Sequence, residues 1–112
     1  LTCVYDWDSL RVGLEPCFVG GAARCFRHDW RYGPPPNAIT PAEVLAFTEA
    51  YEQERGLAFT DEEWRTLGAA VVYTAAYGMR CAHATTRPDA LHYQNSAQQL
   101  QAFVERFLPH ET

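Results

Sequence analysis

The chain is organised around its amino-terminal stretch, residues 1–10, which has the sequence LTCVYDWDSL. Apolar and β-branched residues lead to a carboxylate, Asp6, which is followed by Trp7 and by a second carboxylate, Asp8. A short buried strand over residues 2–5 would place Asp6 at the carboxyl end of the strand, where α/β-type folds most often bind ligands. This stretch is therefore the first candidate for a functional site.

Residues 4–8, VYDWD, resemble the Ile-Asp-Trp/Phe-Glu/Asp segment of the aminoglycoside phosphotransferase and choline kinase-like family, which shares the protein-kinase fold. In that family the segment stands where protein kinases carry Asp-Phe-Gly, and its Asp binds the magnesium ion that bridges the nucleotide phosphates. The resemblance implies that Asp6 binds Mg²⁺ and, through it, ATP or GTP. Asp8 either accepts hydrogen bonds in the turn or contacts a second metal. The structural alternative is a pair of turn carboxylates that caps the next segment.

A helix is expected to follow this stretch. Glu15 and Pro16 suit a first helical turn, and we expect the helix to continue to Phe26. Its centre, VGGAA at residues 19–23, is small and apolar, so a neighbouring element can approach it closely. In the resembled family this helix usually opens with Asp-Leu-Ala, whereas the matching residues 17–19 are CFV. Whether Glu15 replaces the missing Asp is left open.

The second helix has clear start and stop signals. Thr40 suits the N-cap, with Pro at the next position and Glu43 placed for a capping box. We expect this helix to run to Arg55 and to stop at Gly56. Its core-facing residues are predicted from their helical spacing to be Val44, Phe47 and Tyr51, with Ala50 beside them.

The third helix is expected to be central and buried. Thr60 repeats the capping signal, and apolar residues continue at helical spacing as far as Cys81 or His83. Core packing is the expectation for Tyr73 and Tyr77, and pocket lining is the alternative. His83 is expected to be an ordinary interior or surface histidine rather than a base or ligand.

A last helix should open between Pro88 and Ser96 and end before Pro109. The predicted fold is therefore mainly α: a short amino-terminal strand or hairpin followed by about four helices. This arrangement resembles the carboxyl-terminal lobe of a kinase-like phosphotransferase. We interpret residues 1–112 as a single partial domain, because a chain of this length forms one modest core.

The sequence lacks several parts that the resembled enzymes need. It contains no lysine to bind the nucleotide phosphates, no glycine-rich phosphate loop and no His-Gly-Asp catalytic loop. The catalytic base is thus expected upstream, in a longer enzyme that also supplies an amino-terminal lobe, and the isolated chain is expected to be inactive. The resemblance implies transfer of the terminal phosphate of ATP or GTP to a hydroxyl group of a small molecule. The alternative is a non-catalytic helical interaction module.

The composition limits the kinds of binding partner that we expect for this chain. The formal charge of −5 and the pI near 5.2 favour cationic partners and disfavour nucleic acid, which normally requires a basic surface. The sequence has neither an apolar run of bilayer length nor a signal segment, so we expect cytoplasmic residence and no membrane partner. The four cysteines do not form tight pairs, and buried thiols are expected rather than a zinc site. They are Cys3, Cys17, Cys25 and Cys81.

Overall fold

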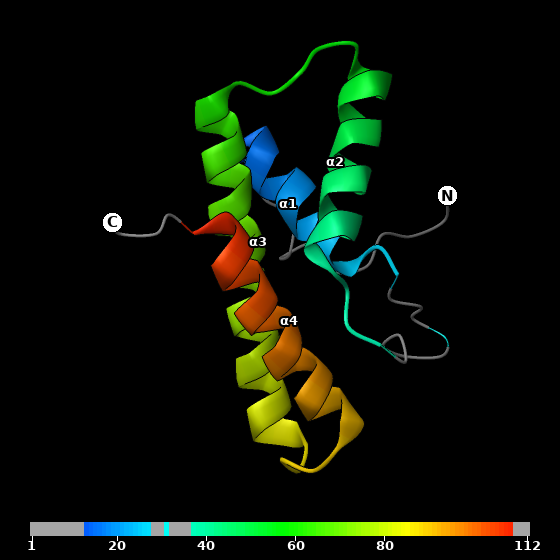
Figure 1. Ribbon diagram of the computed structural model, residues 1–112, viewed down its shortest axis with the longest axis vertical. Helices are drawn as coiled ribbons and strands as arrows, with labels where there is room; N and C mark the ends of the chain where they lie inside the picture. Colours follow the sequence, from blue (N-terminus) through cyan, green and yellow to red (C-terminus); the bar gives the residue numbers. More distant parts are fainter. Residues whose placement is uncertain (1–12, 28–30, 32–36, 109–112) are drawn as a thin grey trace, which may run out of the picture.

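The described part of the protein is a small assembly of helices (Figure 1). The computed structural model describes residues 13–27, 31 and 37–108. Within them the secondary structure consists of four helices, which confirms a mainly α fold. The predicted amino-terminal strand lies outside the described residues. The helices are α1 (Glu15–Cys25), α2 (Pro41–Arg55), α3 (Asp61–Thr85) and α4 (Leu91–Phe107).

Local signals determine the helix boundaries. Both predicted capping boxes form: Thr40 caps α2 together with Glu43, and Thr60 caps α3 together with Glu63. Gly56 ends α2 with a φ of 79°, a left-handed conformation that glycine adopts without steric cost. The predicted starts of all four helices and the predicted end of α2 are confirmed, whereas α3 extends a little beyond its predicted end.

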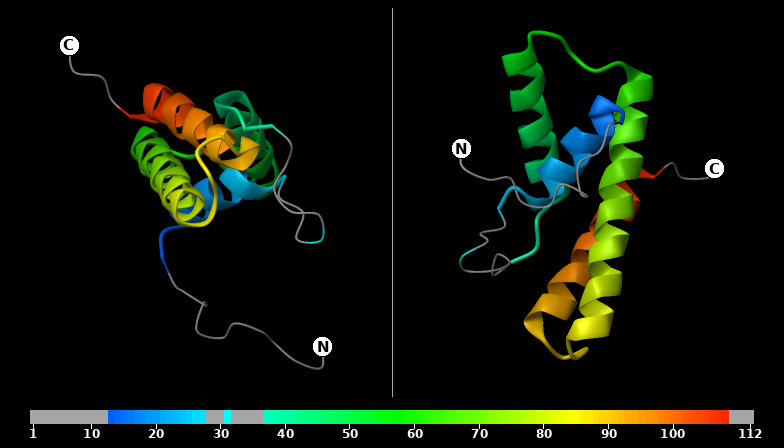
Figure 2. Two further views of the ribbon diagram at one scale, coloured as in Figure 1. Left: turned by 90° about the horizontal axis from the view of Figure 1, so that it is seen from below. Right: turned by 180° about the vertical axis from the view of Figure 1, so that it is seen from behind.

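Helix α3 is central to the arrangement. It packs against α1 on one part of its surface and runs antiparallel to α4 from about Gly68 to its carboxyl-terminal end (Figures 1 and 2). Helix α2 packs mainly on α1, so that α1 lies between α2 and α3. Although α3 has 25 residues, neither it nor another described helix has both the length and the apolar character needed to span a membrane.

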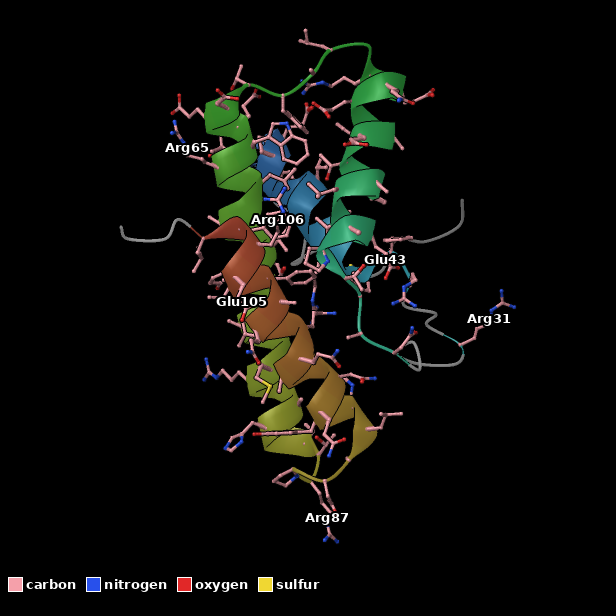
Figure 3. All side chains as sticks on the ribbon, in the orientation of Figure 1. Arg31, Glu43, Arg65, Arg87, Glu105 and Arg106 are labelled. Carbon is pink, nitrogen blue, oxygen red and sulfur yellow. The ribbon has the colours of Figure 1, made fainter. Side chains whose placement is uncertain are left out.

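The core forms where α1, α3 and α4 meet and extends to α2. Its largest fully buried side chains include Phe103 of α4, Leu67 and Val71 of α3, and Val44 of α2. Charged side chains of the same helices project outward, as Arg65 shows in Figure 3. Each helix therefore buries one apolar face in this core.

Small residues allow α1 to approach α3 closely, as its composition predicts. A β-carbon added at Gly20 would lie 2.8 Å from the backbone oxygen of Leu67 and 3.3 Å from the Ala70 β-carbon. At the neighbouring Gly21 the nearest atom, Thr74 Cγ2, would be 3.9 Å away. Gly20 thus lies in the contact with α3, and Gly21 lies beside it.

An aromatic cluster packs at the end of the molecule where α2 connects to α3. The ring of Phe59, in the connecting segment, stacks on Tyr51 with centroids 6.0 Å apart and meets Trp64 edge-on at 6.4 Å. Phe59 is only 6% exposed. Phe59 therefore anchors the connection between α2 and α3 in the core.

The prediction that the middle of α3 is buried is wrong for one face. Tyr73 is 72% exposed and Tyr77 is 59% exposed, so neither packs in the core. Helices α1 and α4 cover only part of the α3 surface, and Tyr73 and Tyr77, one turn apart, share the uncovered face. Ala50 of α2 is also exposed, and buried Thr48 occupies the core position instead.

The prediction of buried thiols is wrong for the three described cysteines, because Cys17, Cys25 and Cys81 are all exposed. In α1 the buried face consists of residues 16, 19, 20 and 23. Cys17 and Cys25 lie outside this face because of their positions in the helical period. Cys3 lies outside the described residues.

Candidate functional site

The predicted magnesium ligands Asp6 and Asp8 lie outside the described residues. The structure does describe the helix that follows them, α1, and its first residue, Glu15. The Glu15 carboxylate forms an ion pair with Arg55 at the end of α2 and accepts a hydrogen bond from Tyr51. Desolvation, followed by this hydrogen bond to a carboxylate, raises the pKa of Tyr51 above its ordinary value. Glu15 therefore joins the start of α1 to α2.

Arg55 extends this connection to the segment after α2. Its Nε donates to the Leu57 carbonyl at 3.0 Å, and its guanidinium carbon lies 4.3 Å from the centroid of the Phe59 ring. The Glu52 carboxylate accepts a hydrogen bond of 2.7 Å from the Phe59 backbone N–H. Arg55 and Glu52 thus stabilise the chain reversal between α2 and α3. Their contacts show a structural role for both residues.

The other sequence candidates do not come together in one site. His83 is exposed, and its ring lies 6.3 Å from that of Tyr93. Within the described residues, no three His, Cys, Asp or Glu side chains are grouped closely enough to hold a metal ion.

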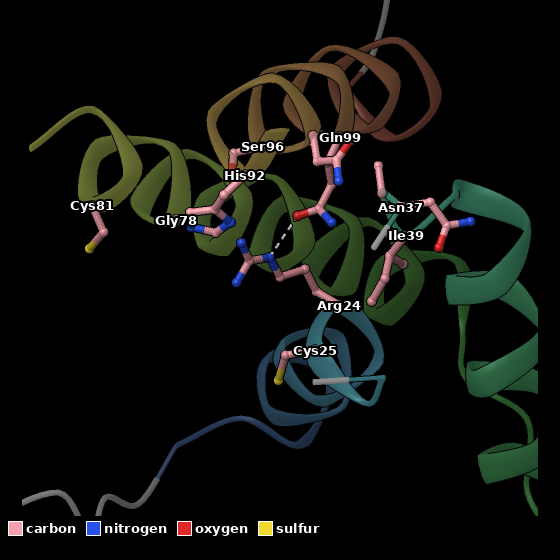
Figure 4. A pocket seen from close by; sticks show the side chains of 11 residues that line it. Arg24, Cys25, Asn37, Ile39, Gly78, Cys81, His92, Ser96 and Gln99 are labelled. Carbon is pink, nitrogen blue, oxygen red and sulfur yellow. Dashed lines mark hydrogen bonds between the residues drawn. The ribbon is translucent and has the colours of Figure 1, made fainter. Parts of the chain in front are cut away.

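A cavity lies between α1, α3 and α4 (Figure 4). It has a volume of about 260 Å³. The segment that leads into α2 forms one wall through Ile39 and its neighbours. Helix α4 forms another wall, and the cavity is partly open to solvent. Its lining residues are Arg24, Cys25, Asn37, Ala38, Ile39, Gly78, Cys81, His92, Asn95, Ser96 and Gln99.

Arg24 is the charged side chain of this cavity. It extends from α1, and its Nε donates a hydrogen bond of 2.9 Å to the Gln99 side-chain oxygen of α4 (Figure 4). Its guanidinium lies against the α3 backbone at Gly78, where an added β-carbon would be 2.1 Å from Nη2. Desolvation by burial lowers the pKa of Arg24 from its ordinary value. Among residues 13–27, 31 and 37–108, no carboxylate forms an ion pair with it.

A second arginine, Arg27, lies just beyond the end of α1 and fixes the wall of the cavity. The terminal nitrogens of Arg27 donate to the Asn37 side chain at 3.0 Å and to the Ala38 carbonyl at 3.1 Å. Its Nε lies 2.7 Å from a carboxylate oxygen of Glu43 in the first turn of α2. Arg27 thus holds the segment before α2 against the end of α1, whereas the charge of Arg24 remains on the cavity side.

Sequence reasoning did not identify the Arg24 cavity. Its residues come from three helices and a connecting segment, and they have no common motif or spacing. One local signal is present in retrospect: Arg24 follows directly on the small apolar run at residues 19–23. Gly78 gives a second signal, because a glycine inside a long helix often marks a close approach by another group.

The comparisons with known proteins found no matching family model, no similar curated protein and no similar solved structure.

Proposed function

We propose that the chain is the carboxyl-terminal part of a kinase-like small-molecule phosphotransferase, in which Asp6 binds Mg²⁺. The observation that carries this proposal is the segment VYDWD at residues 4–8, followed within a few residues by the start of α1. The mainly helical architecture of residues 13–108 is compatible with the lobe that follows this segment in such enzymes.

The proposed chemistry is positioning and neutralisation of charge. A carboxylate is a suitable ligand for Mg²⁺, and the ion supplies charge stabilisation to the terminal phosphate of ATP or GTP. Asp6 holds the ion, while the acceptor is a hydroxyl group of a small molecule. Positive charge on that molecule would suit the formal charge of −5 of the chain. The base and the nucleotide lysine come from an upstream part of the protein.

The contacts around α1 give the described helices a supporting role in this proposal. The Glu15 carboxylate is occupied by Arg55 and Tyr51, so it serves to hold the start of α1 on α2. In this proposal, Glu15 acts through the packing of α1 on α2 and not as a metal ligand.

Magnesium titration of the 112-residue chain tests the proposal. The indole N–H of Trp7 is a nuclear magnetic resonance reporter next to Asp6, and its signal should shift on addition of Mg²⁺ with ATP. Asp6→Asn should abolish the shift, whereas Asp89→Asn should retain it, because Asp89 is an exposed carboxylate whose side chain is 74% accessible. An identical response in all three proteins would show that Mg²⁺ does not bind at Asp6.

The second candidate function is a non-catalytic helical interaction module. The exposed pair Tyr73 and Tyr77 on one face of α3 favours it, because tyrosine is enriched in binding surfaces. In this case the signal of Trp7 would not respond to Mg²⁺, and Asp6→Asn would leave the properties of the chain unchanged. The same titration therefore distinguishes the two candidates.

A further inference from the structure

We propose that the Arg24 cavity is a binding site for the oxyanion group of a small molecule, either a carboxylate or a phosphate monoester. The inference goes beyond the proposed phosphotransferase function and does not depend on Asp6. It is based on the placement of one guanidinium, on the neutral residues around it and on the space beside it.

The first argument is the electrostatic environment of Arg24. Its guanidinium is partly desolvated, and its Nε is bound to a neutral amide, Gln99, at 2.9 Å. Partly buried arginines normally pair with carboxylates, because desolvating a charge is costly unless an opposite charge compensates. Within the described residues no carboxylate forms an ion pair with it. An anionic ligand would supply the missing counter-charge.

The second argument is the orientation of the guanidinium. Because Gln99 engages Nε, the terminal nitrogens point away from it, toward Gly78 and His92 (Figure 4). Gly78 leaves the room that a side chain would fill, so the guanidinium can approach the α3 backbone with Nη2 nearest to it. Two terminal nitrogens presented side by side match the two oxygens of a carboxylate or phosphate.

The third argument is the composition of the cavity. Its volume of about 260 Å³ is several times what a bound water needs and leaves room for a small anion. Polar groups that can donate hydrogen bonds, including His92 and Ser96 of α4, line it beside Arg24. Ile39 and Ala38 supply an apolar wall. A ligand with one anionic end and a short uncharged body fits this combination.

The overall charge of the chain makes the inference testable. With a formal charge of −5, the protein as a whole repels anions, so non-specific association with phosphate or carboxylate should be weak. Localised anion binding is therefore evidence for a particular site. Arg80 provides a matched control, because it is an exposed arginine of α3 that does not line the cavity.

The experiment is a titration of the 112-residue chain with inorganic phosphate and, separately, with acetate, at constant ionic strength maintained with chloride. Backbone and side-chain amide signals of residues such as Gln99 and Ser96 should shift in a saturable manner. Arg24→Gln should weaken binding by at least about tenfold, since it removes a charged hydrogen-bond donor. Arg80→Gln, with the same change in charge, should leave the affinity within about twofold of the original, because exposed charges act weakly at a distance.

Two further variants keep the inference falsifiable if Arg24→Gln disturbs the fold. Gly78→Ala retains the charge but displaces the guanidinium, since the new methyl group would occupy its position at 2.1 Å. Gln99→Glu supplies an internal carboxylate to Arg24. Both should weaken anion binding by at least about tenfold while the circular dichroism spectrum stays helical.

The outcomes are distinct. Tighter saturable binding of phosphate assigns the site to phosphate monoesters, and tighter binding of acetate assigns it to carboxylates. Equal binding by the original chain and by Gly78→Ala and Gln99→Glu, or no saturable shift at the cavity, would overturn the inference. Asp6→Asn should leave these anion shifts unchanged, so the result is separable from that of the magnesium titration.

Discussion

Replacing Gly20 by alanine should destabilise the protein, although alanine is the better helix former. Gly20 lies where α1 crosses α3, and the added methyl carbon would be 2.8 Å from the Leu67 backbone oxygen. It would also lie 3.3 Å from both the Ala70 β-carbon and Val71 Cγ2. A backbone oxygen inside a helix cannot rotate away, so α1 and α3 must separate locally.

The expected magnitude follows from two opposing terms. Overpacking in a well-packed contact costs about 1–3 kcal/mol, and the backbone contact places Gly20→Ala in the upper part of this range. The gain in helix propensity is about 1 kcal/mol. The net loss in the free energy of unfolding should therefore be about 1–2 kcal/mol.

Gly21→Ala is the matched control. At this position the nearest atom, Thr74 Cγ2, is 3.9 Å away, which is an ordinary van der Waals distance. The substitution should stabilise the protein by about 0.5–1 kcal/mol through the helix propensity alone. Urea denaturation followed by circular dichroism measures both variants. If Gly20→Ala is as stable as the original chain or as Gly21→Ala, the close packing of α1 on α3 is refuted.

The remaining predictions concern the core, a helix end and the pH dependence of stability. Phe103→Ala should lower the free energy of unfolding by about 3–5 kcal/mol in urea denaturation, whereas Val104→Ala should cost less than about 1 kcal/mol. The reason is that Phe103 is fully buried and Val104 is 37% exposed; similar losses would contradict the packing of α4. Gly56→Ala should cost about 1 kcal/mol in the same assay, because its φ of 79° is unfavourable for alanine, and an unchanged midpoint would exclude the left-handed cap. Hydrogen bonds from Thr60 lower the pKa of Glu63 in the folded protein. The capping box should therefore stabilise the fold fully above the pKa of an unfolded glutamate, about 4.3. This contribution should be lost as the pH falls through the lower pKa that Glu63 has in the folded state. The midpoint of thermal unfolding should fall less across this acid range for Glu63→Gln than for the original chain. Parallel curves of midpoint against pH for the two proteins would refute this role of Glu63.

The helix boundaries were predictable because their determinants are local. The capping box at Thr40 and the glycine at Gly56 involve residues within a few positions of one another, and the structure confirms both. The small residues at 19–23 likewise predicted a close approach to α1 before the identity of the partner helix was known.

The exposure of individual side chains was less predictable because it depends on which neighbours cover each helix. Apolar residues surround the middle of α3, and the sequence does not reveal that α1 and α4 leave Tyr73 and Tyr77 uncovered. The absence of tight cysteine pairs and the usual burial of single thiols predict interior cysteines, although the helical phase of α1 places Cys17 and Cys25 outside its buried face.

The two candidate sites also differ in how far the sequence predicts them. The proposal for Asp6 is based on a short contiguous segment of the sequence, which lies outside the described residues. The Arg24 cavity depends on contacts between residues far apart in the sequence, such as Arg24 and Gln99, and became visible only in the structure.

The most direct test of the phosphotransferase proposal is the activity of the protein encoded by the complete reading frame that contains these residues. Transfer of phosphate from ATP or GTP to hydroxyl acceptors would be measured with and without Mg²⁺, for the original enzyme and for Asp6→Asn. The proposal predicts magnesium-dependent turnover that falls by more than about a hundredfold in the variant, since a charge-stabilising group is lost. Unchanged turnover and unchanged magnesium dependence in Asp6→Asn would contradict it.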